Sequence, residues 1–322
     1  PIKKGTYMDM MYMPDALRAA KLCKADLVTS AVIEFTSVQG VMGSYYALAS
    51  GETPQVAQAI EQHYRPRFAG DDVPETLVGK VVALADKLDT ICGLFAVNQG
   101  PSGSSDPFAL RRSAIGIVAI LSGDNPLPIS LISAIDASLD LYAKAGIQFD
   151  ATAVRSEVID FFITRTRVML RDSGKGLDAI DAVLAAGVQE PLELIHRVEA
   201  LEQARSNEPD TFENLATVYA RANNLRDPNL GSNVDESLLS EVEHALSCAV
   251  VQAENRVALA LESDNYADAL NELAALRAPI DLFFERVMIM DENQALRENR
   301  LRLLNRFVGV FTNVADFSLL SK

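Results

Sequence analysis

Apolar side chains recur along almost the whole chain at every third or fourth residue, which is the spacing of an α-helix. We find no stretch with the strict apolar and polar alternation of a half-buried β-strand. The pattern predicts helices over residues 14–35, 53–64, 75–95, 106–121, 127–145, 152–173, 176–186, 191–206, 210–226, 240–264, 265–290 and 293–320. The predicted fold class is therefore all-α.

Local signals place the ends of some of these helices. Thr53 and Asp106 each precede a proline, and such a pair supplies an N-cap acceptor followed by a fixed φ at the first helical position. Proline, glycine and asparagine cluster over residues 226–238, which predicts a long loop within or beside a second domain. A chain of 322 residues is long enough for two domains with sizeable cores.

The charge balance limits the partners of the chain. With 29 basic and 44 acidic side chains the net charge is −15, which disfavours generic binding to nucleic acid. Contact with a polyanion then requires a local patch of arginines. Cys23, Cys92 and Cys248 are far apart and odd in number, so neither a disulfide framework nor a CxxC metal site is expected. This cysteine usage favours a reducing compartment.

The sequence shows no membrane or export signal. No apolar run reaches the roughly 18 residues of a membrane span, and residues 1–20 lack the apolar core and cleavage site of a signal peptide. We therefore expect a soluble intracellular protein. Because the chain begins with Pro1 and not with Met, we expect a fragment of something longer.

The helix predicted over 106–121 is apolar on every side, yet its first turn carries Arg111 and Arg112. Cations at that end oppose the helix dipole by a few tenths to about 1 kcal/mol. One interpretation is a buried ion pair with Asp86 or Asp89, which lie three residues apart on one face of the preceding helix. The other is that the arginines and the serine-rich loop before them contact an RNA phosphate.

The segment "HYRPRFAGDD" brings His63, Arg65 and Arg67 together. It is interpreted either as a solvated helix end or as part of a binding site. His196 and His244 fall in unrelated helices, so zinc or di-metal hydrolysis has little support. We predict no catalytic residue and no metal-ligand set.

The segment "QALRENRLRLLNRF" carries a third group of arginines. On a helical wheel Arg297 and Arg300 fall inside the apolar arc, whereas Arg302 and Arg306 occupy the polar face. Arginines on a packed side need either acidic partners or a bound polyanion, and unpaired RNA bases can pair or stack with them. Both interpretations stay open here.

Several blocks of this sequence resemble one known family, in order and spacing. They are "EFTSVQGVMGSYYA", "HYRPRFAGDDVP", "ALADKLDTICGLF", "DPFALRRSAIG", "NELAALRAPIDLFFERVMIM", "LRENRLRLL" and "VADFSLL". Over residues 16–320 the chain is similar to the C-terminal half of the β subunit of bacterial-type heterotetrameric glycyl-tRNA synthetases.

This resemblance implies a domain organisation. It implies an HD-like helical domain over 1–148, linking helices over 149–209, and an anticodon-binding helical bundle of the DALR type over 210–322. Asp86 stands at the terminal metal-ligand position of HD domains, whereas the region of the missing His-Asp dyad offers only Asp26. The metal site of the HD domain therefore looks dismantled.

The resemblance also implies a function. In this family the α subunit makes glycyl-adenylate from ATP with magnesium, and the β subunit binds tRNA. We expect a tRNA-binding portion of a glycine–tRNA ligase without a catalytic site or cofactor of its own. Its partners would be tRNA-Gly and the α subunit or α region, not a membrane or DNA, in the cytoplasm or else in a chloroplast or mitochondrion. The candidate tRNA-binding residues are Arg65, Arg67, Arg111, Arg112, Arg297, Arg300, Arg302 and Arg306.

Two other functions remain alternatives. One is an HD-type metal-dependent phosphohydrolase that uses Asp26 and Asp86, although two carboxylates without histidine are few for a tight transition-metal site. The other is a helical scaffold for subunit assembly. One departure from the family weakens the interpretation of the serine-rich loop as a phosphate contact, since Ser105 stands where many relatives carry lysine.

Overall fold

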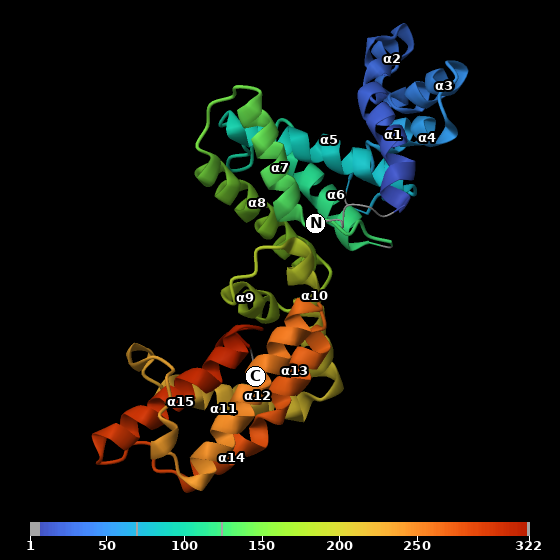
Figure 1. Ribbon diagram of the computed structural model, residues 1–322. Coiled ribbons are helices and arrows are strands. Elements are labelled where there is room, and N and C mark those ends of the chain that lie inside the picture. Colours follow the sequence, from blue (N-terminus) through green and yellow to red (C-terminus); the bar gives the residue numbers. More distant parts are fainter. Residues whose placement is uncertain (1–6, 69, 124, 321–322) are drawn as a thin grey trace. The chain divides into compact units, whose positions relative to one another are not determined.

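The computed structural model describes residues 7–68, 70–123 and 125–320 (Figure 1). Within these residues the regular structure is helical and no strand is present, which confirms the all-α fold class. The α-helices are α1 (Tyr7–Leu22), α2 (Ser30–Glu34), α3 (Val41–Ala49), α4 (Pro54–Gln62), α5 (Leu77–Ala96), α6 (Leu110–Ser122), α7 (Leu131–Lys144), α8 (Ala151–Asp172), α9 (Leu177–Ala185), α10 (Pro191–Asn207), α11 (Pro209–Leu225), α12 (Glu241–Glu262), α13 (Tyr266–Ala275), α14 (Arg277–Arg286) and α15 (Gln294–Thr312). Short 3-10 helices are η1 (Ala25–Val28), η2 (Thr36–Val38), η3 (Pro228–Leu230), η4 (Glu236–Leu238) and η5 (Phe317–Leu319).

The chain forms two compact units. The first contains the chain up to Met169 together with Gln189–Leu192, and the second contains Leu170–Val188 and the chain from Glu193 onward. The division into an HD-like part, linking helices and an anticodon-binding part stays a prediction. Each unit has its own buried apolar core, so each is described by itself.

Helix α4 shows how the first unit is built. Thr53 accepts a hydrogen bond from the Val56 amide and Pro54 occupies the first turn, as the sequence predicted. The helix then buries one apolar face against α1, α3 and α5. The core of this part consists of Ala19, Cys23, Ala47, Val56, Ala57, Ala59, Ile60, Val78 and Val82.

The continuous helix predicted over 14–35 is wrong. Pro14 lies inside α1, which ends at Leu22, and two short helices follow. The reason is the carboxylate of Asp26, which is buried and accepts the amides of Gly40 at 2.6 Å and Gly43 at 3.1 Å. These donors lie far ahead in the sequence, so hydrophobic spacing gave no sign of the break.

The core of the second unit is aromatic. It contains the buried rings of Tyr219, Phe307, Phe311 and Phe317. The centroid of the Phe311 ring lies 5.0–5.3 Å from the centroids of the other three rings. This cluster packs α11, α15 and η5 together. Rings of this size dominate the burial of a small core.

The loop predicted over 226–238 contains only η3 and η4 and is held against α15 by buried carboxamides. Asn299 accepts the amide of Asp235 and donates to its carbonyl. Asn305 donates to the carbonyl oxygens of Asp227 and Gly231. The polar side chains of α15 therefore fix the path of this loop.

The single helix predicted over 265–290 is also wrong, since it is divided into α13 and α14 at Leu276. Pro279 falls in the first turn of α14, where its missing N–H leaves no helical hydrogen bond unmade.

A capping box at Ser240 and Glu243 starts α12.

Candidate nucleic-acid interface

Helix α6 starts later than the sequence predicted. Asp106 does not begin the helix, because Ala109 adopts a left-handed conformation with φ 57° and the first helical residue is Leu110. The Asp106 carboxylate nevertheless accepts the amides of Leu110 at 2.8 Å and Arg111 at 3.0 Å. It caps α6 from four residues away, and both its oxygens are engaged.

The two arginines of the first turn of α6 differ in their surroundings. The Arg111 guanidinium donates to the Gly103 carbonyl at 2.5 Å. Gly103 lies in a tight turn that Ser102 and Ser105 close with two backbone hydrogen bonds. Arg112 is exposed and has no hydrogen-bond or ion-pair partner among the described residues. Within the described ranges, neither arginine therefore has a carboxylate as the partner of its guanidinium.

The expected ion pair of these arginines with Asp86 or Asp89 is not found among the described residues. Asp86 forms an ion pair with Lys24 instead, at 3.0 Å. The Asp89 carbonyl accepts the Tyr142 hydroxyl at 3.0 Å. The physical reason is that α7 packs on α5 at Gly93, where Tyr142 fills the space that a Cβ would need.

The structure adds Arg165 of α8, which sequence reasoning missed. One turn before it, Phe161 packs on Phe95 with ring centroids 5.3 Å apart, and Phe95 also contacts Gly100 at the start of the serine-rich turn. The Arg165 Nε atom is buried and has no hydrogen-bond partner in the described part of the chain. Burial, and then the charge of Arg111, lower the pKa of Arg165, while Asp106 opposes this. Only the tertiary fold brings these residues together.

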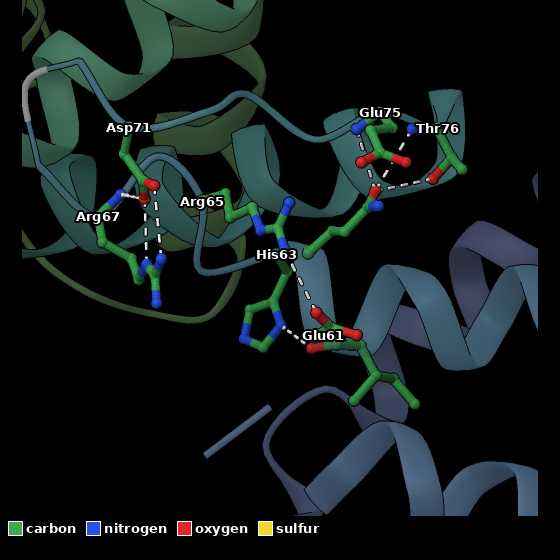
Figure 2. A network of polar contacts seen from close by, with 9 residues as sticks. Glu61, His63, Arg65, Arg67, Asp71, Glu75 and Thr76 are labelled. Carbon is green, nitrogen blue, oxygen red and sulfur yellow. Dashed lines mark hydrogen bonds and ion pairs between the residues drawn. The ribbon is translucent and has the colours of Figure 1, made fainter. Parts of the chain in front are cut away.

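Arg65 and Arg67 line a second surface, a pocket of about 330 Å³ between the α2–α3 connection and the segment after α4. Figure 2 shows both arginines with acidic neighbours. Arg65 contacts Glu61 at 3.3 Å, and the Asp71 carboxylate accepts both the side chain and the backbone amide of Arg67. The hydrogen bond with Asp71 raises the pKa of Arg67. Both charges are already compensated within the chain.

His63 is not part of a solvated helix end. It is fully buried, and its Nδ1 lies 2.6 Å from the Ile60 carbonyl oxygen (Figure 2). Burial, assisted by the positive charge of Lys24, lowers the pKa of His63 to about 4. The imidazole is therefore neutral at pH 7 and belongs to the core.

The arginines of α15 have intramolecular partners. Arg300 is buried and donates to Glu243 at 2.5 Å, to Asp291 at 2.7 Å and to the Met288 carbonyl at 2.8 Å. Arg306 forms a bidentate pair with Glu254, both distances being 2.7 Å. These contacts favour the interpretation in which acidic groups hold the arginines.

The other two arginines of α15 also have partners within the chain, but only Arg302 has a carboxylate partner among the described residues. Arg297 donates to the Asp291 carbonyl at 2.9 Å. Arg302 donates to the Leu230 carbonyl and contacts Glu298 at 3.4 Å. The arginines of α15 therefore hold helix α12, the loop around Leu230 and the segment 288–291 against this helix.

A pocket of about 230 Å³ opens in the second unit between α10, α11 and α13. Phe212, Leu215 and Leu270 give it an apolar lining. Gln203, Asn207 and Asn271 line it as well, and their carboxamides have no hydrogen-bond partner among the described residues. Carboxamides beside an aromatic ring suit a flat heterocycle with donors and acceptors on its edge.

Metal chemistry has no matching ligand set in the described residues. No group of three or more histidine, cysteine or acidic side chains is placed to hold an ion there. Asp26 uses one carboxylate oxygen on two backbone amides, and Asp86 is occupied by Lys24. In the same part of the chain no helix is long and apolar enough to cross a membrane.

Comparison with known proteins gives matches in both units. A family model described as glycyl-tRNA synthetase beta subunit matches residues 3–185, and one described as DALR anticodon binding domain matches residues 215–317. Curated relatives named glycine–tRNA ligase beta subunit are 42% identical over 302 residues in Syntrophus aciditrophicus and 43% identical over 304 residues in Desulforamulus reducens. A third, from Aliivibrio fischeri, is 42% identical over 313 residues.

These alignments cover 94–95% of this chain and 43–44% of each relative. The chain therefore spans less than half the length of the curated relatives it matches. Since the first family model covers more than half of the chain, the chain belongs to the glycyl-tRNA synthetase β-subunit family.

Proposed function

We propose that this chain is the tRNA-binding portion of a glycine–tRNA ligase β subunit. It would hold tRNA-Gly so that the acceptor end reaches the adenylate on the α subunit, which would use the ATP and magnesium. The contribution of this chain to the reaction is then orientation and not proton transfer. We place it in the cytoplasm, in keeping with its bacterial relatives.

The observation that carries this proposal is the match of the anticodon-binding family to residues 215–317 of the second unit. The pocket beside Phe212 supports it, because single-stranded RNA loops are recognised by stacking and by hydrogen bonds to base edges. In this proposal residues 210–322 contact the anticodon side of the tRNA, 149–209 are linking helices, and 1–148 form an HD-like domain without hydrolytic function.

The phosphohydrolase alternative is weaker, because Asp26 and Asp86 belong to no group of three or more possible metal ligands among the described residues, and donors of the chain itself already hold one oxygen of each carboxylate. Ligands of a transition metal need free lone pairs and a fixed geometry. The scaffold alternative makes a different prediction, namely binding to the α subunit without affinity for tRNA.

A fluorescence-anisotropy titration of the chain with labelled tRNA-Gly and a non-cognate tRNA, at two salt concentrations, tests the proposal. We expect cognate-preferring binding that weakens steeply with salt, because charge-assisted contacts to phosphates release counterions. Equal affinity for both tRNAs would remove the anticodon-side role. Absence of binding at low salt would overturn the tRNA-binding proposal and favour the scaffold.

A further inference from the structure

The start of α6 is a place where positive charge gathers without matching negative charge. Arg111 and Arg112 stand in the first turn, where the helix dipole is also positive. Asp106 is the acidic group beside them, and both its oxygens accept backbone amides. The Arg111 guanidinium rests on the neutral carbonyl of Gly103.

Arg165 adds a third cation to this place. One turn before Arg165 on α8, Phe161 packs on Phe95, whose ring edge lies where a Cβ at Gly100 would sit. The charges of Arg111 and Asp106 both act on Arg165, so it lies within electrostatic reach of the start of α6. Its Nε atom is buried without a partner, so no acceptor in the described part of the chain explains the position of this guanidinium. Arg165 as a whole is half-buried, so part of its side chain is exposed to solvent.

The remaining surface of this place suits an anion. Ser102, Gly103, Ser104 and Ser105 are exposed, and the turn is fixed by its own backbone hydrogen bonds and by Arg111. Serine hydroxyls and arginine guanidinium groups both donate hydrogen bonds, and phosphate oxygens accept such bonds. By contrast, Arg65 and Arg67 (Figure 2) and three arginines of α15, Arg300, Arg302 and Arg306, are paired with carboxylates within the chain.

We propose that Arg111, Arg112 and Arg165, with the turn Ser102–Ser105, form a binding site for a phosphate group in the first unit. If the proposed function holds, on which this assignment of the source rests, the group is a phosphodiester of the tRNA backbone. A free anion such as pyrophosphate offers the same chemistry. The site recognises charge and carries no base specificity.

The first test compares tRNA-Gly binding by the wild-type chain with that of Arg112→Ala, Arg165→Met and a matched control. Arg155→Met removes an equal charge from the same helix α8, where Arg155 is already paired with Asp136. We expect each site variant to weaken binding about five- to tenfold for cognate and non-cognate tRNA alike. A plot of the logarithm of the association constant against the logarithm of the salt concentration should be less steep by about 1 in each site variant. The control should match the wild type.

A second variant and a thermal scan separate binding from folding. Arg165→Lys keeps the charge but not the planar fork, so we expect the wild-type salt slope with weaker binding. If Arg165→Met lowers the melting temperature by several degrees, its weaker binding can come from misfolding. The Arg112→Ala variant then tests the site, because the Arg112 side chain is exposed and its removal should leave the fold intact. Unchanged affinity and slope in Arg112→Ala and Arg165→Lys would overturn the site.

A third arm distinguishes the source of the phosphate and keeps the two proposals apart. Pyrophosphate is added to wild type and to Arg165→Lys, and the melting temperature is followed. If wild type binds no tRNA but pyrophosphate stabilises it more than the variant, the tRNA function fails and the site holds a free anion. If neither tRNA nor pyrophosphate distinguishes variants from wild type, the site itself is refuted.

Discussion

Arg112 and Arg300 are both candidate RNA-binding residues from the sequence, and their surroundings give them opposite roles. Arg112 is exposed with no partner in the described part of the chain, whereas Arg300 is buried among Glu243, Asp291 and the Met288 carbonyl. A buried pair is costly to break because the remaining charge stays desolvated. We infer that Arg300 holds the second unit together and leave it out of the proposed RNA contacts.

Replacing Arg300 by Ala is therefore expected to lower the free energy of unfolding by about 3–5 kcal/mol, since Glu243 remains buried and loses its main donor. Urea denaturation followed by circular dichroism measures this loss. Arg302→Ala, which breaks a partly exposed pair with Glu298, serves as control and should cost under about 1 kcal/mol. Equal urea midpoints for Arg300→Ala and wild type would contradict the structural role.

His63 gives the first unit a pH dependence. Its pKa is about 4 in the folded chain, because of burial first and of Lys24 second, and about 6.5 in the unfolded chain. The unfolded chain therefore takes up the proton first. We expect the stabilisation to be complete above about pH 6.5 and to be lost as the pH falls toward 4, by roughly 3 kcal/mol in all.

Urea unfolding of wild type and His63→Gln between pH 7.5 and pH 4.5 checks this expectation. The carboxylates titrate in both proteins, so the difference in free energy of unfolding between them isolates the histidine. That difference should shrink as the pH is lowered. Two parallel curves would show that protonation of His63 does not oppose folding.

At the scale of elements, glycines decide how closely helices pack. Gly93 lies on α5 four residues after Asp89, and a residue without a Cβ lets a neighbouring element come close to a helix. The structure places the phenol of Tyr142 from α7 at that position. The apolar spacing within α5 does not say which element packs there.

Gly93→Ala is expected to cost about 1–3 kcal/mol, because the new Cβ would lie 2.2 Å from the Tyr142 hydroxyl oxygen. Gly309 in α15 is a matched control, since a Cβ there meets nothing within 4 Å. Gly309→Ala should stabilise by about 0.5–1 kcal/mol through the lower entropy of the unfolded chain. Thermal unfolding of the two variants should give shifts of opposite sign, and shifts of the same sign would refute the packing account.

At the scale of the whole molecule, two units with separate cores should respond separately to mutation. We expect Arg300→Ala to speed amide hydrogen exchange in α12, α14 and α15 and to leave α4 and α5 unchanged. Gly93→Ala should do the reverse. Hydrogen exchange read out by mass spectrometry resolves both units in one experiment, and equal acceleration everywhere would mean that they unfold as one.

The net charge of −15 also acts on the whole molecule. It repels nucleic acid at long range, so the contacts expected in the proposed function must come from local arginines whose charge the chain does not already neutralise. This requirement separates Arg112 from Arg306, which is fully paired with Glu254. The sequence does not tell which of the eight candidate arginines are paired, because several of their partners, such as Glu243 and Glu254, lie far away along the chain.

The sequence by itself determined the all-α class, most helix ranges, the loop after α11 and the family, since these rest on local spacing, capping residues and matched blocks. It did not determine the break at Asp26, the partner of Asp86 or the place of Arg165. Those depend on donors and charges that the tertiary fold brings within a few ångströms across tens of residues. Hydrophobic periodicity reports which face of a helix is buried, and only the packed structure decides what that face meets.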